Sequence, residues 1–311
     1  MVFFELVSLS LFLGVIAWVY LKEMFLFTQL VFAKLRHKKD KQQFFRRHLV
    51  LHFLALIGVI CFLYAYFIEP YRIEVKSLEI FTGKFKKISL RVVQISDLHC
   101  DRKIRNEYKL IKIVNELNPD IIIFTGDALN TPEALGLFKE TMGKLKANIG
   151  KYAVLGNIDY YWRNLELYKG SGFVVLGSAV IELVKQGEKF FISGLSYHAI
   201  NNLKLLLKRV PVRNYNIFLY HTPDLIRDAK NMGVDLYLCG HIQGGQVALP
   251  FYGAIVTLSR QGKKYERGEY LVGKTILYVN RGIGMEGGIF PRVRFFSRPE
   301  ITVFDIKPKP F

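Results

Sequence analysis

Residues 90–99 read LRVVQISDLH, an apolar run with the composition of a buried strand that ends in two polar side chains, Asp97 and His99. The same arrangement recurs in residues 120–127, DIIIFTGD, where an isoleucine-rich run ends in a glycine and Asp127. In α/β proteins, ligands bind in the crevice beyond the carboxyl ends of the strands. The two stretches therefore predict strands whose ends meet at a common site.

Three later blocks have the same form, a short apolar run followed by polar residues. They end in Gly156-Asn157-Ile158-Asp159, in His221, and in Gly240-His241-Ile242-Gln243. Taken singly, an Asp or Asn after a strand is as readily a turn residue or a helix cap, and a single His is commonly structural. All five blocks occurring in order favour a binding site over these separate explanations.

The side chains of this set are those of a metal site. Carboxylate and amide oxygens mixed with imidazole nitrogens suit Mn²⁺, Fe or Zn²⁺. The three cysteines, Cys61, Cys100 and Cys239, have no paired spacing, so neither a thiolate cluster nor a disulfide framework is predicted. Glycines beside the candidate ligands would let the backbone approach the metals closely, since they lack a Cβ.

Beyond Pro70, short apolar runs alternate with segments of helical periodicity, which predicts a layered α/β domain. The expected strands are Leu90–Ile95, Asp120–Phe124, Tyr152–Leu155, Phe173–Leu176, Phe190–Ser193, Asn216–Tyr220, Asp235–Leu238, Thr275–Val279 and Glu300–Phe304. The expected helices are Asn106–Leu117, Pro132–Lys146, Ala199–Lys208 and Pro223–Met232.

The first 69 residues have a different character. Val2–Leu21 and Leu49–Ile68 are apolar stretches of about twenty residues, the length of helix that crosses a bilayer core of ~30 Å. A signal peptide fits the first poorly, because it lacks a basic start and a small-residue cleavage site. A buried core helix is the alternative for the second. We expect a membrane anchor of two transmembrane helices at residues 1–69 and a catalytic domain at residues 70–311, giving an integral protein of the cell membrane.

The linker between the two apolar stretches is basic, with Lys34, Arg36, Lys38, Lys39, Lys41, Arg46 and Arg47. Short basic loops usually stay in the cytoplasm, which would place the domain on the far side of the membrane. The start of the domain is also basic, and a first helix lying in the membrane interface would reverse the orientation. The side of the membrane is therefore open.

The five blocks match, in order, the signature of calcineurin-like metallophosphoesterases, and the resemblance spans about Leu90 to Asp305. It implies a four-layer αββα sandwich with two metal ions at the strand ends. The segments 278–284 and 299–301 resemble the branch of this family that has membrane-anchored or exported members.

The resemblance also implies a role for each residue. The first metal would be held by Asp97, His99, Asp127 and Gln243, and the second by Asp127, Asn157, His221 and His241, with Asp127 bridging. The expected cofactors are two divalent ions, Mn²⁺ first, with Fe or Zn²⁺ as alternatives. The expected reaction is in-line attack by a metal-bridging hydroxide, with Asp127, Asn157 and His241 as the catalytic set. Asn157 would also orient the phosphoryl group. Arg281 is either a further substrate contact or part of a structural ion pair.

Two positions depart from the family pattern. Gln243 stands where most members of the branch have His, although the similar 5′-nucleotidase and UDP-sugar hydrolase group has Gln there. Ile158 stands where most members have a His that protonates the leaving oxygen. An alkoxide leaving group gains ~10²–10⁴-fold from a general acid, whereas a phosphate needs little help. The UDP-2,3-diacylglucosamine pyrophosphatases of the superfamily, which cleave a diphosphate, also lack this His.

We therefore expect a metal-dependent phosphohydrolase that cleaves a diphosphate in a lipid or nucleotide-lipid such as UDP-2,3-diacylglucosamine. That particular substrate would require a cytoplasmic domain. A general phosphomonoesterase or phosphodiesterase at the membrane, and a metal-binding pseudoenzyme, are the alternatives. The net charge of +18 suits an anionic partner. It is spread along the chain without a recognition motif, so nucleic acid is not expected as a partner.

Overall fold

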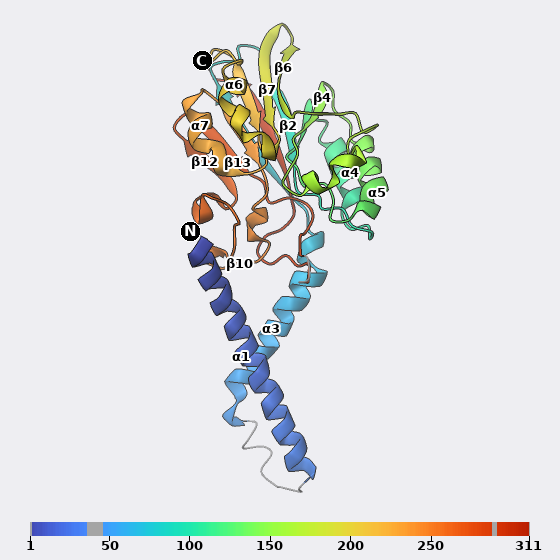
Figure 1. The fold of residues 1–311 in the computed structure, drawn as a ribbon, viewed down its shortest axis with the longest axis vertical. Coiled ribbons are helices and arrows are strands. Elements are labelled where there is room, and N and C mark those ends of the chain that lie inside the picture. The colour runs from blue at the N-terminus through green and yellow to red at the C-terminus, as the bar shows by residue number, and fades with distance from the viewer. Residues whose placement is uncertain (1, 36–45, 288–290, 311) are drawn as a thin grey trace.

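A computed structural model describes residues 2–35, 46–287 and 291–310. Figure 1 shows two long helices that extend from one end of an α/β domain. The part of the basic linker that contains Arg36, Lys38, Lys39 and Lys41 lies outside the described residues.

The two helices are α1 (Val2–Leu35) and α3 (Leu49–Phe67). They cross below the domain (Figure 1), and the Tyr20 hydroxyl of α1 donates to the Ala55 carbonyl of α3 at 3.0 Å. Both are long and apolar enough to cross a membrane, over Phe3–Phe32 and Leu49–Tyr71, and only 11% of either stretch is buried against the rest of the chain. A buried core helix is therefore disfavoured for the second stretch.

The first sheet has six strands in the order β1-β14-β2-β3-β4-β5. All neighbours are parallel except β14 and β2, which are antiparallel. The strands are β1 (Glu74–Thr82), β14 (Glu300–Pro308), β2 (Leu90–Ile95), β3 (Ile121–Phe124), β4 (Gly150–Ala153) and β5 (Phe173–Val175). The strands that carry the first two polar blocks, β2 and β3, are therefore adjacent and point the same way.

The second sheet has six strands in the order β12-β13-β9-β8-β7-β6. Its four central strands are parallel, and the two edge strands run antiparallel to their neighbours. The strands are β12 (Gly268–Val272), β13 (Thr275–Val279), β9 (Leu236–Cys239), β8 (Tyr215–Leu219), β7 (Glu188–Leu195) and β6 (Ser178–Lys185). A small separate ribbon pairs β10 (Ala248–Leu249) with β11 (Gly253–Ala254).

Three apolar clusters fix the layers. Val114 of α4 (Glu107–Glu116) and Phe138 of α5 (Leu135–Lys144) pack on the outer face of the first sheet. Residues of both sheets share the central cluster, and Leu206 of α6 (Leu203–Leu207) packs on the second sheet with α7 (Ile226–Asn231). The order helix, sheet, sheet, helix confirms the four-layer αββα sandwich.

Short 3₁₀ helices fill many of the connections. They are η1 (Glu69–Tyr71), η2 (Pro132–Ala134), η3 (Asp159–Leu165), η4 (Tyr197–Asn202), η5 (Pro223–Leu225), η6 (Gln243–Gly245) and η7 (Gly262–Tyr265). Every strand expected from the sequence is present within a few residues. Strands β1, β6 and β12, which all lie at sheet edges, were not anticipated, and neither were the short strands β10 and β11.

The long helices dock on the domain through buried polar groups. The Glu5 carboxylate, 6% exposed, accepts hydrogen bonds from Thr257. The Glu69 carboxylate, just beyond α3, accepts from the backbone N–H groups of Phe296 at 3.0 Å and Ser297 at 2.5 Å. Buried carboxylates persist only when they are paired or hydrogen-bonded, so both helix ends are tied to specific loops of the domain.

Candidate metal centre

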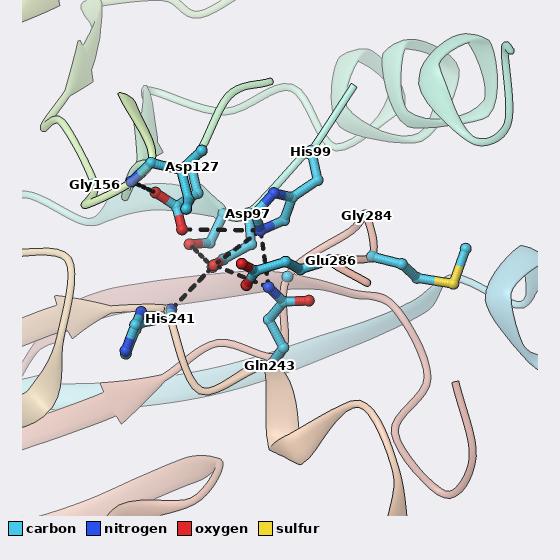
Figure 2. A network of polar contacts seen from close by, with 12 residues as sticks. Asp97, His99, Asp127, Gly156, His241, Gln243, Gly284 and Glu286 are labelled. Carbon is cyan, nitrogen blue, oxygen red and sulfur yellow. Dashed lines mark hydrogen bonds and ion pairs between the residues drawn. The ribbon is translucent and has the colours of Figure 1, made fainter. Parts of the chain in front are cut away.

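The candidate ligands lie in loops at the carboxyl ends of five strands. Asp97 and His99 follow β2, Asp127 follows β3, Asn157 follows β4, His221 follows β8, and His241 and Gln243 follow β9. Figure 2 shows Asp97, His99, Asp127 and Gln243 converging on one point from both sheets. The structure thus brings together side chains that are up to 146 positions apart in the sequence.

The acidic and imidazole side chains form two groups that share one carboxylate. Asp97, His99 and Asp127 are one group, Asp127, His221 and His241 the other, and within each the ligand atoms lie within 4.8 Å of one another. Asp127 Oδ2 is 3.1 Å from His221 Nε2 and 3.8 Å from His99 Nε2. A carboxylate between two such groups has the position that a bridging ligand requires.

The hydrogen bonds of His221 leave one nitrogen free for a cation. Its Nδ1 lies 2.6 Å from the Thr125 carbonyl oxygen and must donate to it, because a carbonyl only accepts. Its Nε2 is buried and makes no hydrogen bond of acceptable geometry within the described residues, although Asp127 Oδ2 lies 3.1 Å away; the buried Asn157 Oδ1 also has no hydrogen-bond partner there. Buried acceptors without partners are rare in folded proteins. Both atoms are of the kind that coordinates a divalent metal, so the donor set fits such an ion.

The electrostatics of the cluster indicate the same need for positive charge. Burial raises the pKa of Asp97 to about 7. Burial opposes protonation of His221, yet the negative charge of Asp127 beside it raises its pKa to about 10. Burial likewise works to raise the pKa of Asp127, but the charge of His221 outweighs it and lowers that pKa. A proton on His221 and a metal ion are alternative ways to balance these buried carboxylates.

Gln243 lies within the first group, as expected, but with its amide nitrogen inward. Its Nε2 is 2.9 Å from His99 Nε2, and its Oε1 accepts from Arg294 at 3.4 Å. An amide nitrogen has no lone pair to offer a metal, so coordination requires the amide to turn over. The oxygen and nitrogen of an amide are nearly equal in shape, so the turn changes no packing, but it gives up the hydrogen bond that Gln243 Oε1 accepts from Arg294.

A chain of buried hydroxyls holds Asp97 in place. Ser96 donates to Asp97 Oδ2 at 2.5 Å, Thr125 donates to Ser96 at 2.7 Å, and the Gln94 amide donates to Thr125 at 3.2 Å. Sequence reasoning missed this chain. Its signal is that Ser96 and Thr125 are both polar residues directly after an apolar run, the position at which the site itself was found.

Asp159 ties two loops of the site together. One carboxylate oxygen accepts from the backbone N–H groups of Asp127 at 2.9 Å and Gly156 at 2.8 Å, and the other accepts from Ala128 at 2.8 Å. Ile158 contributes through its backbone, donating to Asp127 Oδ1 at 3.0 Å. Asp159 therefore acts as a positioning residue for Asp127, a role that the sequence analysis did not assign.

Backbone strain is concentrated at the candidate ligands. Asp97, His99, Asp127, His241 and Gln243 all have positive φ, between 41° and 69°. Such conformations cost of the order of 1–3 kcal/mol each and cluster at functional sites. The neighbouring glycines permit the close packing of these loops, since a Cβ on Gly156 would overlap Asp127 and a Cβ on Gly240 would overlap Ser96.

Arg281 is committed to other partners. Its guanidinium is 7% exposed and forms ion pairs with Glu300 and, at 2.6 Å, with Glu74. Of the two roles expected for it, these contacts favour the structural ion pair. Arg294, which is fully buried, was missed: it donates to the carbonyl oxygens of Gly284 and Ser297 and reaches Gln243.

Glu286 is a further acidic residue that the sequence analysis did not single out. Figure 2 shows its side chain directed toward the group formed by Asp97, His99 and Gln243. Burial raises its pKa, and the charge of Asp127 raises it further. It lies two residues after Gly284, the end of the segment 278–284 that the sequence analysis had singled out, so its proximity to the site was open to inference.

Residues 90–244 match the calcineurin-like phosphoesterase family. The chain is 35% identical over 258 residues to the uncharacterized metallophosphoesterase YkuE of Bacillus subtilis (strain 168), covering 78% of this chain and 89% of that protein. It is 26% identical to the UDP-2,3-diacylglucosamine pyrophosphatase LpxG of Chlamydia muridarum (strain MoPn / Nigg), covering 79% and 92%. It is 25% identical to the phosphodiesterase YaeI of Escherichia coli (strain K12), covering 78% and 92%.

The chain therefore belongs to the calcineurin-like metallophosphoesterase family. It is a phosphoester hydrolase whose two Asp/His groups match the dinuclear metal site on which this family relies.

Proposed function

We propose that this protein is a membrane-anchored phosphohydrolase that cleaves a diphosphate bond in a lipid or nucleotide-lipid, with UDP-2,3-diacylglucosamine as the specific candidate. The observation that carries the proposal is Ile158. It occupies the position beside Asn157 from which a proton donor would serve the leaving group, and it offers only a backbone N–H, already bonded to Asp127. A site without this acid suits a leaving group that needs no protonation.

Seven side chains would hold two divalent metal ions, Mn²⁺ being our first choice. The first ion would be held by Asp97, His99, Asp127 and Gln243, and the second by Asp127, Asn157, His221 and His241. Bound there, the metals would lower the pKa of a water molecule and neutralise the phosphoryl oxygens. In our proposal Asp127 serves both ions, and Asn157 also orients the phosphoryl group.

Neighbouring buried residues hold the candidate metal ligands in position. Asp159 fixes the loops that carry Asp127 and Asn157, and Ser96 fixes the carboxylate of Asp97. Both are almost completely buried, so they exclude water from the rear of the site. Outer hydrogen bonds of this kind commonly change metal affinity or activity 10–100-fold when removed.

Two independent features support the lipid part of the proposal. The helices α1 and α3 are long enough to hold the domain at a bilayer surface. The similarity to the pyrophosphatase LpxG extends over 79% of the chain. Its named substrate combines a diphosphate with acyl chains, the combination that Ile158 and the anchor would each favour.

A phosphodiesterase is the second candidate, and Glu286 is the observation in its favour. Its carboxyl group points to the first metal group and has a raised pKa, so it is suited to supply the proton that Ile158 cannot. The similarity to the phosphodiesterase YaeI is consistent with this alternative.

The test is a substrate panel for the purified full chain with Mn²⁺, comparing UDP-2,3-diacylglucosamine, an alkyl phosphate monoester, an alkyl phosphate diester and phospholipids. Preferential release of UMP from the UDP-lipid supports the proposal. Faster cleavage of the diester, together with its loss in Glu286→Gln, would support the phosphodiesterase instead. No hydrolysis of any substrate, at full metal content, would indicate a pseudoenzyme.

A further inference from the structure

A large cavity lies where α3 enters the domain, away from the metal centre. Its volume is about 1010 Å³, and it is lined by α3, by β1 and by the segments 267–268 and 295–300. Binding pockets for small molecules commonly measure roughly 300–1,000 Å³. The cavity is therefore large enough for a lipid headgroup with the first part of its chains.

One wall of this cavity is apolar and belongs to the proposed membrane span. Ile60, Cys61 and Tyr64 of α3 line it, together with Phe295 and Phe296. Phe295 packs edge-on against Tyr64 and Phe296, with ring centres 6.3 Å and 4.7 Å apart. Ile60 and Phe296 are 56% and 52% exposed, so this apolar surface is open toward the place that lipid would occupy.

The polar lining of the cavity has an excess of one positive charge, with the cations Lys76, Arg267, Arg281 and Arg298 against the acids Glu69, Glu74 and Glu300. The acidic residues there are engaged: Glu74 and Glu300 pair with Arg281, and Glu69 accepts backbone N–H groups. Lys76 and Arg298 have neither a hydrogen bond nor an ion pair to any residue that the structure describes, although the charges of both help to lower the pKa of the nearby Glu74.

Arg267 adds a third cation to this polar lining. It uses one guanidinium nitrogen on the Phe296 carbonyl oxygen and keeps its remaining N–H groups for another acceptor. The cavity thus combines three cationic side chains with an apolar wall, and α3, which forms part of that wall, is the helix proposed to enter the bilayer.

We propose that this cavity binds one anionic glycerophospholipid, with its phosphate between Lys76, Arg267 and Arg298 and its chains along the α3 face of Ile60 and Tyr64. The inference rests on the proposed membrane anchoring, because only a spanning α3 brings its apolar wall to the depth of lipid chains. A zwitterionic lipid fits less well, since its headgroup has no net negative charge to balance the excess positive charge of the lining.

This site is distinct from the metal centre. None of the seven candidate metal ligands lines the cavity. The two sites are separated by η6, because Arg281 and Arg267 lie against the outer side of Gly244, the residue after Gln243. The bound lipid is therefore a ligand that the hydrolase holds, and not its substrate.

Native mass spectrometry of the full chain from nanodiscs of equal phosphatidylglycerol and phosphatidylcholine tests the proposal. We expect phosphatidylglycerol to be retained about tenfold over phosphatidylcholine, as two or more added cations near a lipid surface would give. The variant Lys76→Ser/Arg298→Gln should lose this preference. The matched control Lys204→Ser/Arg209→Gln, changed at exposed positions around α6, should keep it.

Cys61 allows a second measurement on the native protein, so the result does not depend on whether a variant folds. It is half-buried in the cavity wall, whereas Cys100 and Cys239 are buried. Reaction of Cys61 with N-phenylmaleimide should fill the apolar part and reduce lipid retention. Free glycerol 3-phosphate should not displace the lipid, because it has no chains for the α3 wall.

Equal retention of both phospholipids, or a preference that survives in the Lys76→Ser/Arg298→Gln variant, would overturn the proposal. Displacement by free glycerol 3-phosphate would overturn the part assigned to the chains. Alkaline carbonate extraction of the same membranes distinguishes failure of the membrane anchor from failure of the lipid site. Protein released by carbonate would contradict the membrane anchor. Protein that stays in the membrane but shows no lipid preference would contradict only the lipid site proposed here.

Discussion

Glu5, in the first turn of α1, accepts hydrogen bonds from the backbone N–H and the hydroxyl of Thr257, at 3.1 Å and 2.5 Å. The next residue, Leu258, places its carbonyl oxygen 3.4 Å from His241 Nε2. The N-terminal helix is thus attached one residue away from a contact to the second metal group. On the other side, Glu69 bonds to Ser297, whose hydroxyl donates to the Gln243 carbonyl at 2.6 Å.

We predict that Glu5→Ala weakens metal binding as well as helix docking. The change removes two hydrogen bonds to a buried carboxylate, worth about 2 kcal/mol, and frees the loop that positions His241. The Mn²⁺ concentration for half-maximal activity should rise about tenfold, which is the lower end of the range of effects seen when a residue that supports a metal ligand is removed.

Glu23→Ala is the matched control for this prediction. Glu23 lies in the same helix and contacts His52 of α3 at 2.8 Å, far along the chain from the domain contacts. It should leave the Mn²⁺ requirement unchanged. Equal effects of both variants would mean that helix pairing, and not the Thr257 contact, supports the site.

Metal dependence should be complete. Excess chelator should abolish hydrolysis, and Mn²⁺ should restore it. Asp127→Asn should lower activity more than ~100-fold, beyond the usual effect of an outer-sphere change, because the shared carboxylate serves both groups. Metal analysis should find fewer than two equivalents in this variant, and the exposed Asp228→Asn should match the native protein. Activity that persists in chelator would rule out the dinuclear mechanism.

Arg294→Lys should be destabilising although the charge is kept. Arg294 is fully buried and donates to three carbonyl oxygens, those of Gly284, Ser297 and Arg281. The single ammonium group of lysine cannot reproduce the fixed, planar arrangement of guanidinium donors. Each buried acceptor left without a partner costs ~1–3 kcal/mol. Thermal denaturation in detergent should show a lower midpoint than for the exposed control Arg209→Lys. Equal midpoints would show that a single ammonium satisfies the site.

The central strands could be predicted because their apolar runs are continuous. β2 and β13 were predicted to the residue, since both are covered on two faces and contain few polar interruptions. Most residues of the edge strands β1, β6 and β12 are exposed or half-buried, and each of these strands contains at least one charged residue. Such a pattern is easily taken for a loop when its neighbours in the sheet are unknown.

The candidate ligands could be predicted because each stands directly after a strand, and parallel strand ends meet at one edge. The supporting contacts could not. Arg294 lies in a basic segment, PRVR, that reads as exposed, and its buried partners come from loops elsewhere in the chain. The pairing of Glu5 with Thr257 joins residues 252 positions apart. No local pattern encodes a contact of that kind.

The side of the membrane can be tested with two reporters. Because both α1 and α3 meet the domain at one end, two full spans would place the linker and the domain on opposite sides of the bilayer. A cysteine in residues 38–43 should react as cytoplasmic under the positive-inside rule, and a reporter after Phe311 as extracytoplasmic. Both reporters on one side would contradict two spans. A cytoplasmic C-terminus would favour the UDP-lipid substrate.

The Asp159 carboxylate bears on what a histidine at position 158 can do. Its oxygens already accept three backbone N–H groups, from Asp127, Gly156 and Ala128. It is fully buried, and burial raises its pKa to about 6. It therefore has little capacity left to orient a new imidazole at the neighbouring position.

The leaving-group hypothesis predicts that the native protein cleaves diphosphates far faster than alkyl phosphate esters. Ile158→His should leave diphosphate cleavage nearly unchanged, because protonating a phosphate leaving group gains little. It should raise alkyl ester cleavage by up to ~10²-fold, the lower end for a general acid, if the imidazole reaches the leaving oxygen. Ile158→Leu is the control for packing and should change neither rate. Because the Asp159 carboxylate is already engaged, an unaltered rate of ester cleavage in Ile158→His would show only that the new imidazole does not reach the leaving oxygen.

The comparison of substrates in the native protein is decisive. Equal rates on alkyl esters and diphosphates under Mn²⁺ would refute this interpretation of Ile158 and favour proton donation by Glu286. In that case Glu286→Gln should abolish the cleavage of alkyl esters.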